Sequence, residues 1–208
     1  MAADRFVWLE PLGPQHDVDR FTSGCSVLDE YLRVRGLLEQ RAAKVRTYVV
    51  SRYETVVAYV TLAPGVIETE LRAEEVRQRL RRRTIPVIAL CRIAVDAPDQ
   101  RNGLGKAVLF EAIRRSVPAA EVIGARAIVT HALGGSARSF FEKNGFDRLP
   151  GDPYRLSLPL PALPSAGRGI GSGALEYNRY TQRVRIQSRA PESRGGDMVS
   201  TGLMSEFG

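Results

Sequence analysis

The stretch from Val87 to Ala120 reads VIALCRIAVDAPDQRNGLGKAVLFEAIRRSVPAA. Its first part, Val87–Val95, is an almost unbroken apolar run rich in β-branched residues, which predicts a strand buried on both faces. Its last part carries apolar residues at helical spacing, which predicts a helix that begins close to Gly105. The stretch therefore predicts a strand, a glycine turn and a helix, in that order.

The turn reads Gln100-Arg101-Asn102-Gly103-Leu104-Gly105 and is followed by Lys106. The first N–H groups of a helix have no partner within it and carry the positive end of its dipole. Glycines let an anion approach these groups, and Arg101 and Lys106 add positive charge, so the turn predicts a pyrophosphate site. A third glycine and a Gly-Lys-Ser/Thr ending are both missing, which excludes the dinucleotide fingerprint and the P-loop.

Length and composition limit the remaining possibilities. With 208 residues, 44% of them hydrophobic, the chain can form one good core but not two large domains. The net charge of +7 is compatible with a polyanionic partner, or it simply maintains solubility. Cys25 and Cys91 are too few for a disulfide framework and lack metal-ligand spacing, so no metal site is expected. Without a signal peptide pattern or a membrane-length apolar run, we expect a cytoplasmic protein that does not enter membranes.

Short strands and helices are expected around the central unit. The patterns predict an edge strand at 6–9, a helix from 26 to about 43 whose cap is Ser26 with Asp29, a hairpin of 46–50 and 56–62, a strand at 127–130, a helix at 137–143 that Asn144-Gly145 ends, and last strands near 146 and at 156–160. This order predicts an α/β (α+β) protein with a mixed central sheet and flanking helices.

Two segments depart from this pattern. Residues 68–84 are strongly charged and predict a short amphipathic helix with a basic face. Its arginines either contact nucleic acid or form a solvated connection, and the nucleic-acid candidates are Arg77, Arg79, Arg81, Arg82 and Arg83. From Pro161 onward the composition changes to Pro, Gly, Ser and Arg. We therefore expect one domain over 5–161 and a disordered basic tail over 162–208.

The pattern Gln100-x-x-Gly103-x-Gly105 resembles the acetyl-CoA pyrophosphate loop of the GNAT acetyltransferases. Further segments are similar to the GNAT toxins of bacterial toxin–antitoxin pairs. These segments are Phe21-x-x-Gly24, Leu28-Asp29-x-Tyr31-Leu32, Leu90-x-Arg92-Ile93-Ala94-Val95-Asp96, His131-Ala132-Leu133 and Phe140-Phe141-Glu142-x-x-Gly145-Phe146. Together with the order of the elements, they indicate a GNAT fold over roughly residues 5–161, whose central sheet contains a splayed pair of strands.

The resemblance implies transfer of an acetyl group from acetyl-CoA, the co-substrate, to the α-amino group of an aminoacyl-tRNA. A tRNA modified in this way no longer serves elongation, so such a protein is a toxin, and a ribbon-helix-helix antitoxin normally neutralises it. A basic surface suits tRNA, because phosphate contacts supply affinity that does not depend on sequence. Whether the chain forms a homodimer is left open by the sequence.

The resemblance also implies the residues of the site. Acetyl-CoA would lie along the splayed strand at Ile93, Ala94 and Val95. Its pyrophosphate would lie on the loop that consists of Arg101, Asn102, Gly103, Leu104, Gly105 and Lys106. A backbone N–H of the strand would polarise the thioester carbonyl, and the amine would attack directly, so that proximity of the two substrates supplies much of the acceleration.

Phe141 marks a departure from the family pattern, which commonly has a tyrosine here as the acid that protonates the departing thiolate. Phenylalanine has no proton to donate. Transfer either proceeds more slowly with water or a nearby hydroxyl such as Ser139, or the chain is a weakened toxin, or it binds acetyl-CoA without turnover. A small-molecule amine or a protein N-terminus is an alternative acceptor. His131, Glu142 and Asp96 are expected to have local structural roles.

Overall fold

A computed structural model describes residues 8–69 and 83–160 of the chain. Within these ranges the strands form one mixed sheet in the order β1-β2-β3-β4-β5-β7-β6. The strands are β1 (Glu10–Pro11), β2 (Arg46–Arg52), β3 (Thr55–Thr69), β4 (Arg83–Val95), β5 (Ala127–His131), β6 (Asp147–Arg148) and β7 (Arg155–Pro159). Strands β4 and β5 pair in parallel, and the other neighbours pair antiparallel. The mixed sheet expected from the sequence is confirmed.

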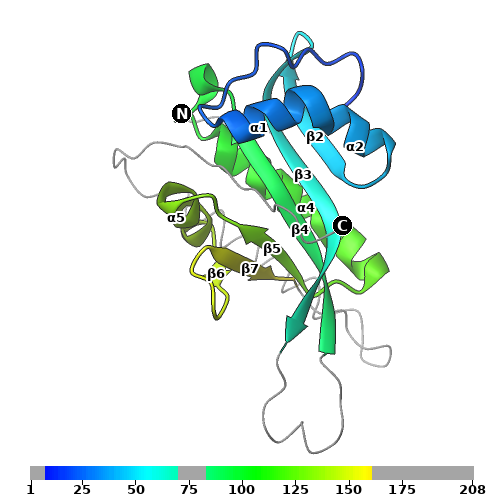
Figure 1. The fold of residues 1–208 in the computed structure, drawn as a ribbon, viewed down its shortest axis with the longest axis vertical. Helices are drawn as coiled ribbons and strands as arrows, with labels where there is room; N and C mark the ends of the chain where they lie inside the picture. Colours follow the sequence, from blue (N-terminus) through cyan, green and yellow to red (C-terminus); the bar gives the residue numbers. More distant parts are fainter. Residues whose placement is uncertain (1–7, 70–82, 161–208) are drawn as a thin grey trace, which may run out of the picture.

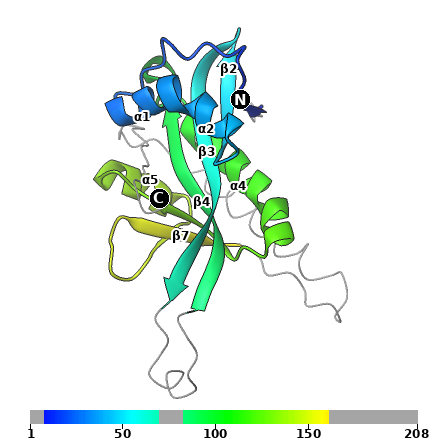
Figure 2. The ribbon, with the colours of Figure 1, turned by 45° about the vertical axis from the view of Figure 1, so that its right-hand side comes forward.

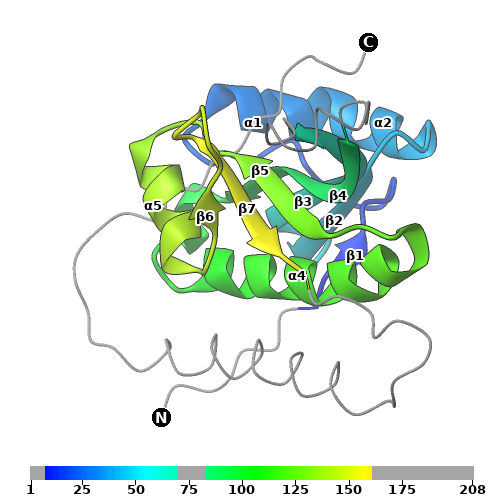
Figure 3. The same ribbon diagram turned by 90° about the horizontal axis from the view of Figure 1, so that it is seen from below.

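Helices cover both faces of this sheet. The segments α1 (Ser26–Glu30), η1 (Tyr31–Gly36, a π-helix) and α2 (Leu37–Arg41) follow one another without a break. They lie on one face, and α4 (Leu104–Ile123) lies on the other (Figure 3). The short helix α5 (Gly135–Lys143) lies at the β5–β6 end of the sheet (Figure 1). None of the helices in the described part of the chain is long and apolar enough to span a membrane.

Strand β4 separates two hydrophobic clusters. Ile93 and Val95 pack into the larger cluster with residues of α4, whereas Ala94 belongs to the cluster beneath η1. Successive side chains of a strand point to opposite faces, so one strand can supply both clusters. The prediction that residues 87–95 are buried on both faces is confirmed, and α4 begins at Leu104, next to the expected Gly105.

Several expected elements are confirmed, and the N-terminal ones differ in detail. The hairpin, the strand after residue 126, the helix ending at Gly145 and the strand before residue 160 are all present. The edge strand, however, lies at Glu10–Pro11 instead of 6–9. The carbonyl oxygen of Leu9 accepts a hydrogen bond from the Arg115 side chain at 2.6 Å, and sheet pairing with β2 covers only Glu10 and Pro11. Residues 6 and 7 lie outside the described part.

The expected cap of the first helix is wrong. Cys25, not Ser26, is the N-cap residue, and no side chain caps the helix. The buried Asp29 instead accepts hydrogen bonds from the N–H (2.8 Å) and the hydroxyl (2.6 Å) of Ser23. Gly24, at φ 86°, turns the chain so that Ser23 faces Asp29. The carboxylate therefore fixes the loop before α1, which a local capping pattern cannot indicate.

Only the two ends of the helix expected over 68–84 lie within the described residues. Strand β3 extends to Thr69 and β4 starts at Arg83, so both ends of this segment are strand. Residues 70–82, with Arg77, Arg79, Arg81 and Arg82, lie outside the described residues, as does the tail 162–208. The domain boundary near residue 161 and the basic nucleic-acid face therefore stay predictions.

Candidate active site

The parallel pair β4 and β5 is joined over a very short distance. Main-chain pairing is confined to Ile88 with Ile128 and Ala89 with Val129. One residue further, the hydroxyl of Thr130 donates to the carbonyl oxygen of Leu90 at 2.9 Å. Beyond this link the two strands diverge (Figure 1). The C-terminal half of β4 therefore has an edge that no described strand covers.

The main chain of β4 alternates between its neighbour β3 and this open edge. Asp96 N–H donates to the carbonyl oxygen of Val57 at 2.8 Å, and Ala94 lies opposite Tyr59. In an antiparallel ladder, successive residues turn their main-chain groups to opposite sides. Asp96 and Ala94 therefore face β3, and Val95 and Ile93 face the open edge. Of the three strand residues expected to bind acetyl-CoA, only Ala94 has its main chain engaged by β3.

Gln100 fixes the end of this edge. Its side-chain amide donates to the carbonyl oxygens of Ser23 at 2.8 Å and Val95 at 2.9 Å. The loop before α1 is thereby tied to the last residue of β4. The sequence pattern marks Gln100 only as the first residue of the loop motif, because neither partner is recognisable from the local sequence. Among the residues that the structure describes, the N–H of Val95 and the N–H and carbonyl of Ile93 have no partner at this edge.

The loop after β4 leaves the start of α4 uncapped. Arg101 (φ 64°) and Gly103 (φ 78°) adopt left-handed conformations, and Gly103, as N-cap, offers no side chain to the helix. The first intrahelical bond runs from Ala107 to Gly103, so the preceding N–H groups have no helical partner. Arg101 and Lys106 form no ion pair within the described residues. The loop thus combines free N–H groups with two unpaired cations, as an anion site requires.

Gly105 lies where three parts of the site meet. A Cβ atom at this position would lie 3.5 Å from Val95 Cγ2 and 4.0 Å from Phe140 Cε2. The start of α4 is therefore close to both the end of β4 and helix α5. These are ordinary van der Waals distances, so a small side chain fits here, but it would also shield the N–H groups of the first helical turn.

Exchanging each glycine for alanine separates backbone strain from crowding. Nothing lies within 4 Å of a Cβ atom at Gly103, but its φ of 78° is unfavourable for any other residue. We expect Gly103→Ala to lower the free energy of unfolding by about 1 kcal/mol. Gly105 lies in a helix and is not crowded, so Gly105→Ala should leave the free energy of unfolding unchanged or raise it. Urea unfolding of both variants measures this, and equal losses would contradict the explanation.

Phe141 is part of an aromatic cluster in the core. Its side chain is 0% exposed, and its ring meets those of Phe140 and Phe146 edge-on, at centroid distances of 5.4 and 5.2 Å. Ser139 is half-buried and lies two residues earlier on α5. Side chains two positions apart on a helix do not face each other. The structure therefore does not bring Ser139 to Phe141, and the catalytic role of either stays a prediction.

Three further titratable residues have polar partners among the described residues. His131 Nε2 lies 3.1 Å from Asp152 Oδ2, and Asp96 accepts a hydrogen bond from Thr22 N–H at 2.7 Å. Glu142 pairs with Arg148, and this hydrogen bond lowers the pKa of the Glu142 carboxyl. Glu142 lies in the last turn of α5. All three therefore have contacts of the kind that a structural role requires, and that role stays a prediction.

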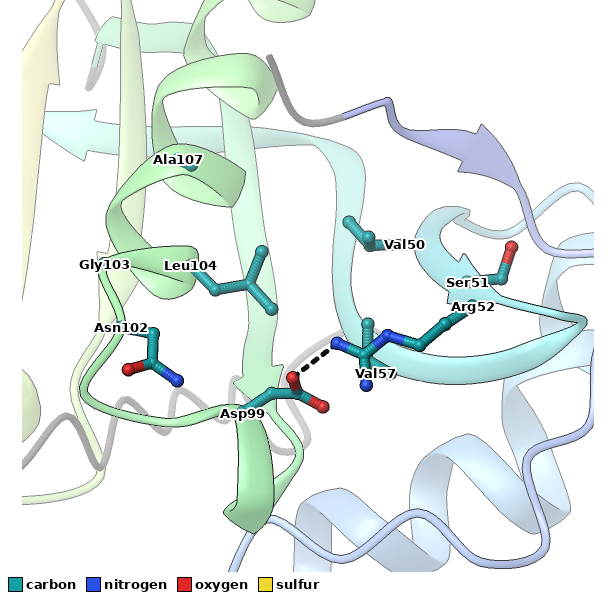
Figure 4. Close-up of a pocket in the computed structure, with 9 residues that line it drawn as sticks. All are labelled: Val50, Ser51, Arg52, Val57, Asp99, Asn102, Gly103, Leu104 and Ala107. Atoms are coloured by element: carbon teal, nitrogen blue, oxygen red, sulfur yellow. Dashed lines mark hydrogen bonds and ion pairs between the residues drawn. The ribbon is translucent and has the colours of Figure 1, made fainter. Parts of the chain in front are cut away.

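A cavity of about 200 Å³ adjoins the loop on its β2 side (Figure 4). Its lining residues are Val50, Ser51, Arg52, Val57, Asp99, Asn102, Gly103, Leu104 and Ala107. Arg52 Nη2 donates to Asp99 Oδ1 at 2.7 Å across it. The cavity shares only Asn102, Gly103 and Leu104 with the site expected from the sequence, which missed Arg52 and Asp99 because the hairpin and the loop are distant in the chain. The loop is thus accessible from this side.

Comparison with known proteins adds an independent line of evidence. No family model matches the chain. A tRNA-acetylating toxin from Mycobacterium tuberculosis (strain ATCC 25618 / H37Rv) is 41% identical over 142 residues, which cover 68% of this chain and 85% of the relative. A solved tyrosine-to-phenylalanine mutant of the toxin AtaT is 25% identical, with a TM-score of 0.65 and coverage of 73% of this chain and 88% of AtaT.

A second structure of that mutant, bound to the C-terminus of the antitoxin AtaR and to acetyl-CoA, is 26% identical, with a TM-score of 0.63. The match covers 73% of this chain and 92% of the other. The splayed strand pair and the uncapped helix start are thus found in a chain that shares both sequence and fold with characterised toxins. The chain belongs to the tRNA-acetylating toxins, acetyltransferases of the GNAT type from toxin–antitoxin systems.

Proposed function

We propose that the protein transfers the acetyl group of acetyl-CoA to the α-amino group of an aminoacyl-tRNA and so blocks translation as a toxin. The observation that carries this proposal is the open edge of β4 at Ile93 and Val95, next to the uncapped start of α4. The 41% identical relative, a tRNA-acetylating toxin, supports the choice of acceptor.

The residues at the open edge of β4 and at the start of α4 fit acetyl-CoA. Its pantetheine arm carries amide groups, which can pair with the unused main-chain groups of Ile93 and Val95 as an added strand would. Its pyrophosphate suits the free N–H groups at the start of α4, with Arg101 and Lys106 nearby. The main chain of Ala94 pairs with β3, so Ala94 holds Ile93 and Val95 in position and does not bond acetyl-CoA itself. In this arrangement Asn102, Gly103, Leu104 and Gly105 form the cradle of the phosphates.

Positioning and electrostatics supply the chemistry that these residues can perform. An N–H of the open edge donates to the thioester carbonyl oxygen, where negative charge develops as the amine attacks. Holding the amine and the thioester in contact provides the remaining acceleration. Water accepts the proton that the attacking nitrogen loses and, because Phe141 donates none, water also protonates the departing thiolate. Because general acid help is typically worth roughly 100- to 10,000-fold, transfer is slow but real.

The proposal extends to partners and location. The AtaT mutant was solved with the C-terminus of its antitoxin AtaR, and we propose that an antitoxin likewise neutralises this protein. The ribbon-helix-helix class of that antitoxin and a homodimer stay predictions. The protein would act in the cytoplasm, where aminoacyl-tRNA is located.

The first test measures transfer directly. The full chain is incubated with radiolabelled acetyl-CoA and a mixed pool of aminoacyl-tRNA, and label is counted in the RNA fraction. We expect label in charged tRNA and none in tRNA that was deacylated beforehand. Labelling of a polyamine or a peptide N-terminus with no label in the RNA would contradict the proposed acceptor and favour the alternative one.

A further inference from the structure

Arg92 is the residue of β4 that precedes the open edge. It lies one position before Ile93, and its side chain is half-buried. Its guanidinium carbon lies 3.5 Å from the centroid of the Tyr31 ring. Tyr31 belongs to the π-helix η1, so Arg92 lies on the face of the sheet that η1 covers, opposite to α4. This is the face of the open edge that α4 leaves free.

No hydrogen bond or ion pair engages the Arg92 guanidinium within the described residues. Glu39 is the carboxylate whose charge, like that of Arg92, affects the pKa of Tyr31, but it is already paired with Arg35 at 2.8 Å. A guanidinium has five N–H donors in a planar fork. Those of Arg92 are therefore available to a ligand, although the group is held in place.

The Tyr31 ring beneath Arg92 is held firmly in place. Tyr31 is 3% exposed, and its ring stacks with that of Tyr59 at a centroid distance of 6.4 Å. The Tyr59 hydroxyl in turn donates to the carbonyl oxygen of Leu28 at 2.9 Å. Burial raises the pKa of the Tyr31 hydroxyl, so the ring beneath the cation stays neutral. The π-helical turn that carries Tyr31 is a local irregularity of the kind often found at functional sites.

The two faces of the sheet at the open edge of β4 bind different substrates in this proposal. The proposed pyrophosphate site is the start of α4, so acetyl-CoA reaches the open edge of β4 from the face of the sheet that α4 covers. Direct attack requires the amine to reach the thioester from the side that acetyl-CoA leaves open. That side is the η1 face, on which the Arg92 guanidinium is stacked over Tyr31. An acceptor that reaches the thioester therefore passes Arg92.

We propose that Arg92, supported by Tyr31, positions the acceptor by binding a backbone phosphate of the RNA close to its aminoacylated 3′ end. A planar guanidinium binds phosphate oxygens in pairs, and stacking on an aromatic ring fixes the plane of the fork. The inference rests on the proposed function, because it takes the acceptor to be an aminoacyl-tRNA. It assigns to Arg92 a role in acceptor binding, separate from acetyl-CoA binding.

The test compares Arg92→Gln and Arg92→Lys with an Arg115→Gln control. Arg115 is also half-buried and stacked, at 4.9 Å from the centroid of the Tyr48 ring, but it is satisfied by Glu111 and by the carbonyl oxygen of Leu9. Each variant is assayed with aminoacyl-tRNA and with an aminoacyl-adenosine that has no phosphate. Thermal melting shows that the variants are folded.

We expect Arg92→Gln to raise the KM for aminoacyl-tRNA by about 10- to 100-fold, the value of a charge-assisted contact. The KM for acetyl-CoA and the rate with aminoacyl-adenosine should change less than about twofold. Arg92→Lys should recover part of the loss, because it keeps the charge without the fork. Arg115→Gln should leave all constants unchanged. Equal losses with both acceptors, or an unchanged KM for aminoacyl-tRNA, would overturn the assignment.

A binding measurement separates this inference from the proposed function. If the unaltered protein acetylates neither acceptor, the proposed function fails, and binding still tests Arg92. The probe is a short single-stranded RNA with a CCA end. Removing one phosphate contact should lower the slope of log affinity against log salt concentration by about 0.7. An unchanged slope in Arg92→Gln would overturn the phosphate contact.

Discussion

Phe141→Tyr is expected to raise kcat for acetyl transfer at least about 100-fold. The resemblance to the toxin family places the acid that protonates the thiolate at this position, and phenylalanine supplies none. Helix α5, which carries Phe141, lies close to the proposed acetyl-CoA site, since Phe140 approaches Gly105 at the start of α4. Restoring the hydroxyl should therefore add general acid catalysis while leaving the KM for acetyl-CoA within about twofold. Steady-state kinetics on aminoacyl-tRNA measure both.

Phe146→Tyr is the matched control for this variant. It adds the same hydroxyl to the same aromatic cluster, at a residue that is 2% exposed and lies beyond α5. A buried hydroxyl without a partner costs about 1–3 kcal/mol, so this control should be less stable and no faster. If Phe141→Tyr shows the same loss of stability with no gain in kcat, its hydroxyl points into the core, and the acid would have to come from elsewhere.

Gln100→Glu should be the most damaging single exchange in the loop. The native amide donates hydrogen bonds to the carbonyl oxygens of Ser23 and Val95. A carboxylate donates none and places a negative charge against two carbonyl oxygens. We expect the free energy of unfolding at pH 7 to fall by about 2–4 kcal/mol. Because Val95 ends the open edge, the KM for acetyl-CoA should rise at least about tenfold.

The pH dependence of this loss identifies its cause. The charged form of the new carboxyl is unfavourable in the fold, so its folded pKa lies above the unfolded value of about 4.3. The loss is therefore fully present above the folded pKa and is reduced as pH falls through it. Gln100→Ala, which removes the hydrogen bonds without adding charge, should lose less, by an amount independent of pH. Urea unfolding between pH 4 and 8 distinguishes the two, and a Gln100→Glu loss that does not change with pH would contradict this explanation.

Local patterns were sufficient for the central unit of the fold. The apolar run that forms β4 and the helical spacing after residue 104 depend on neighbouring residues alone. The left-handed conformation of Gly103 follows from the same local rule that makes glycine favourable in a turn. Such features are predictable because each residue's conformation depends mainly on side chains within one or two turns of chain.

Local patterns failed where one of several nearby residues had to be chosen. The expected cap at Ser26 is replaced by Ser23 bonded to Asp29, because Gly24 turns the loop. The edge strand predicted at 6–9 is observed at Glu10–Pro11, because pairing with β2 decides its position. In both cases the predicted position lies within a few residues of the observed one. The local turn at Gly24 decided the first case, and pairing with the distant strand β2 decided the second.

The sequence by itself determined the strand, the glycine loop and the helix, and its motifs indicated the family of acetyltransferases. The tertiary structure alone decided that β4 and β5 part after Ala89, that Gln100 closes the end of the open edge, and that Phe141 is buried. It also placed the Arg92 guanidinium on the Tyr31 ring, with no carboxylate of residues 8–69 or 83–160 paired with it. The physical reason is distance along the chain: Gln100 and Ser23 are 77 residues apart, and only packing of the sheet between its two helical layers brings such groups together.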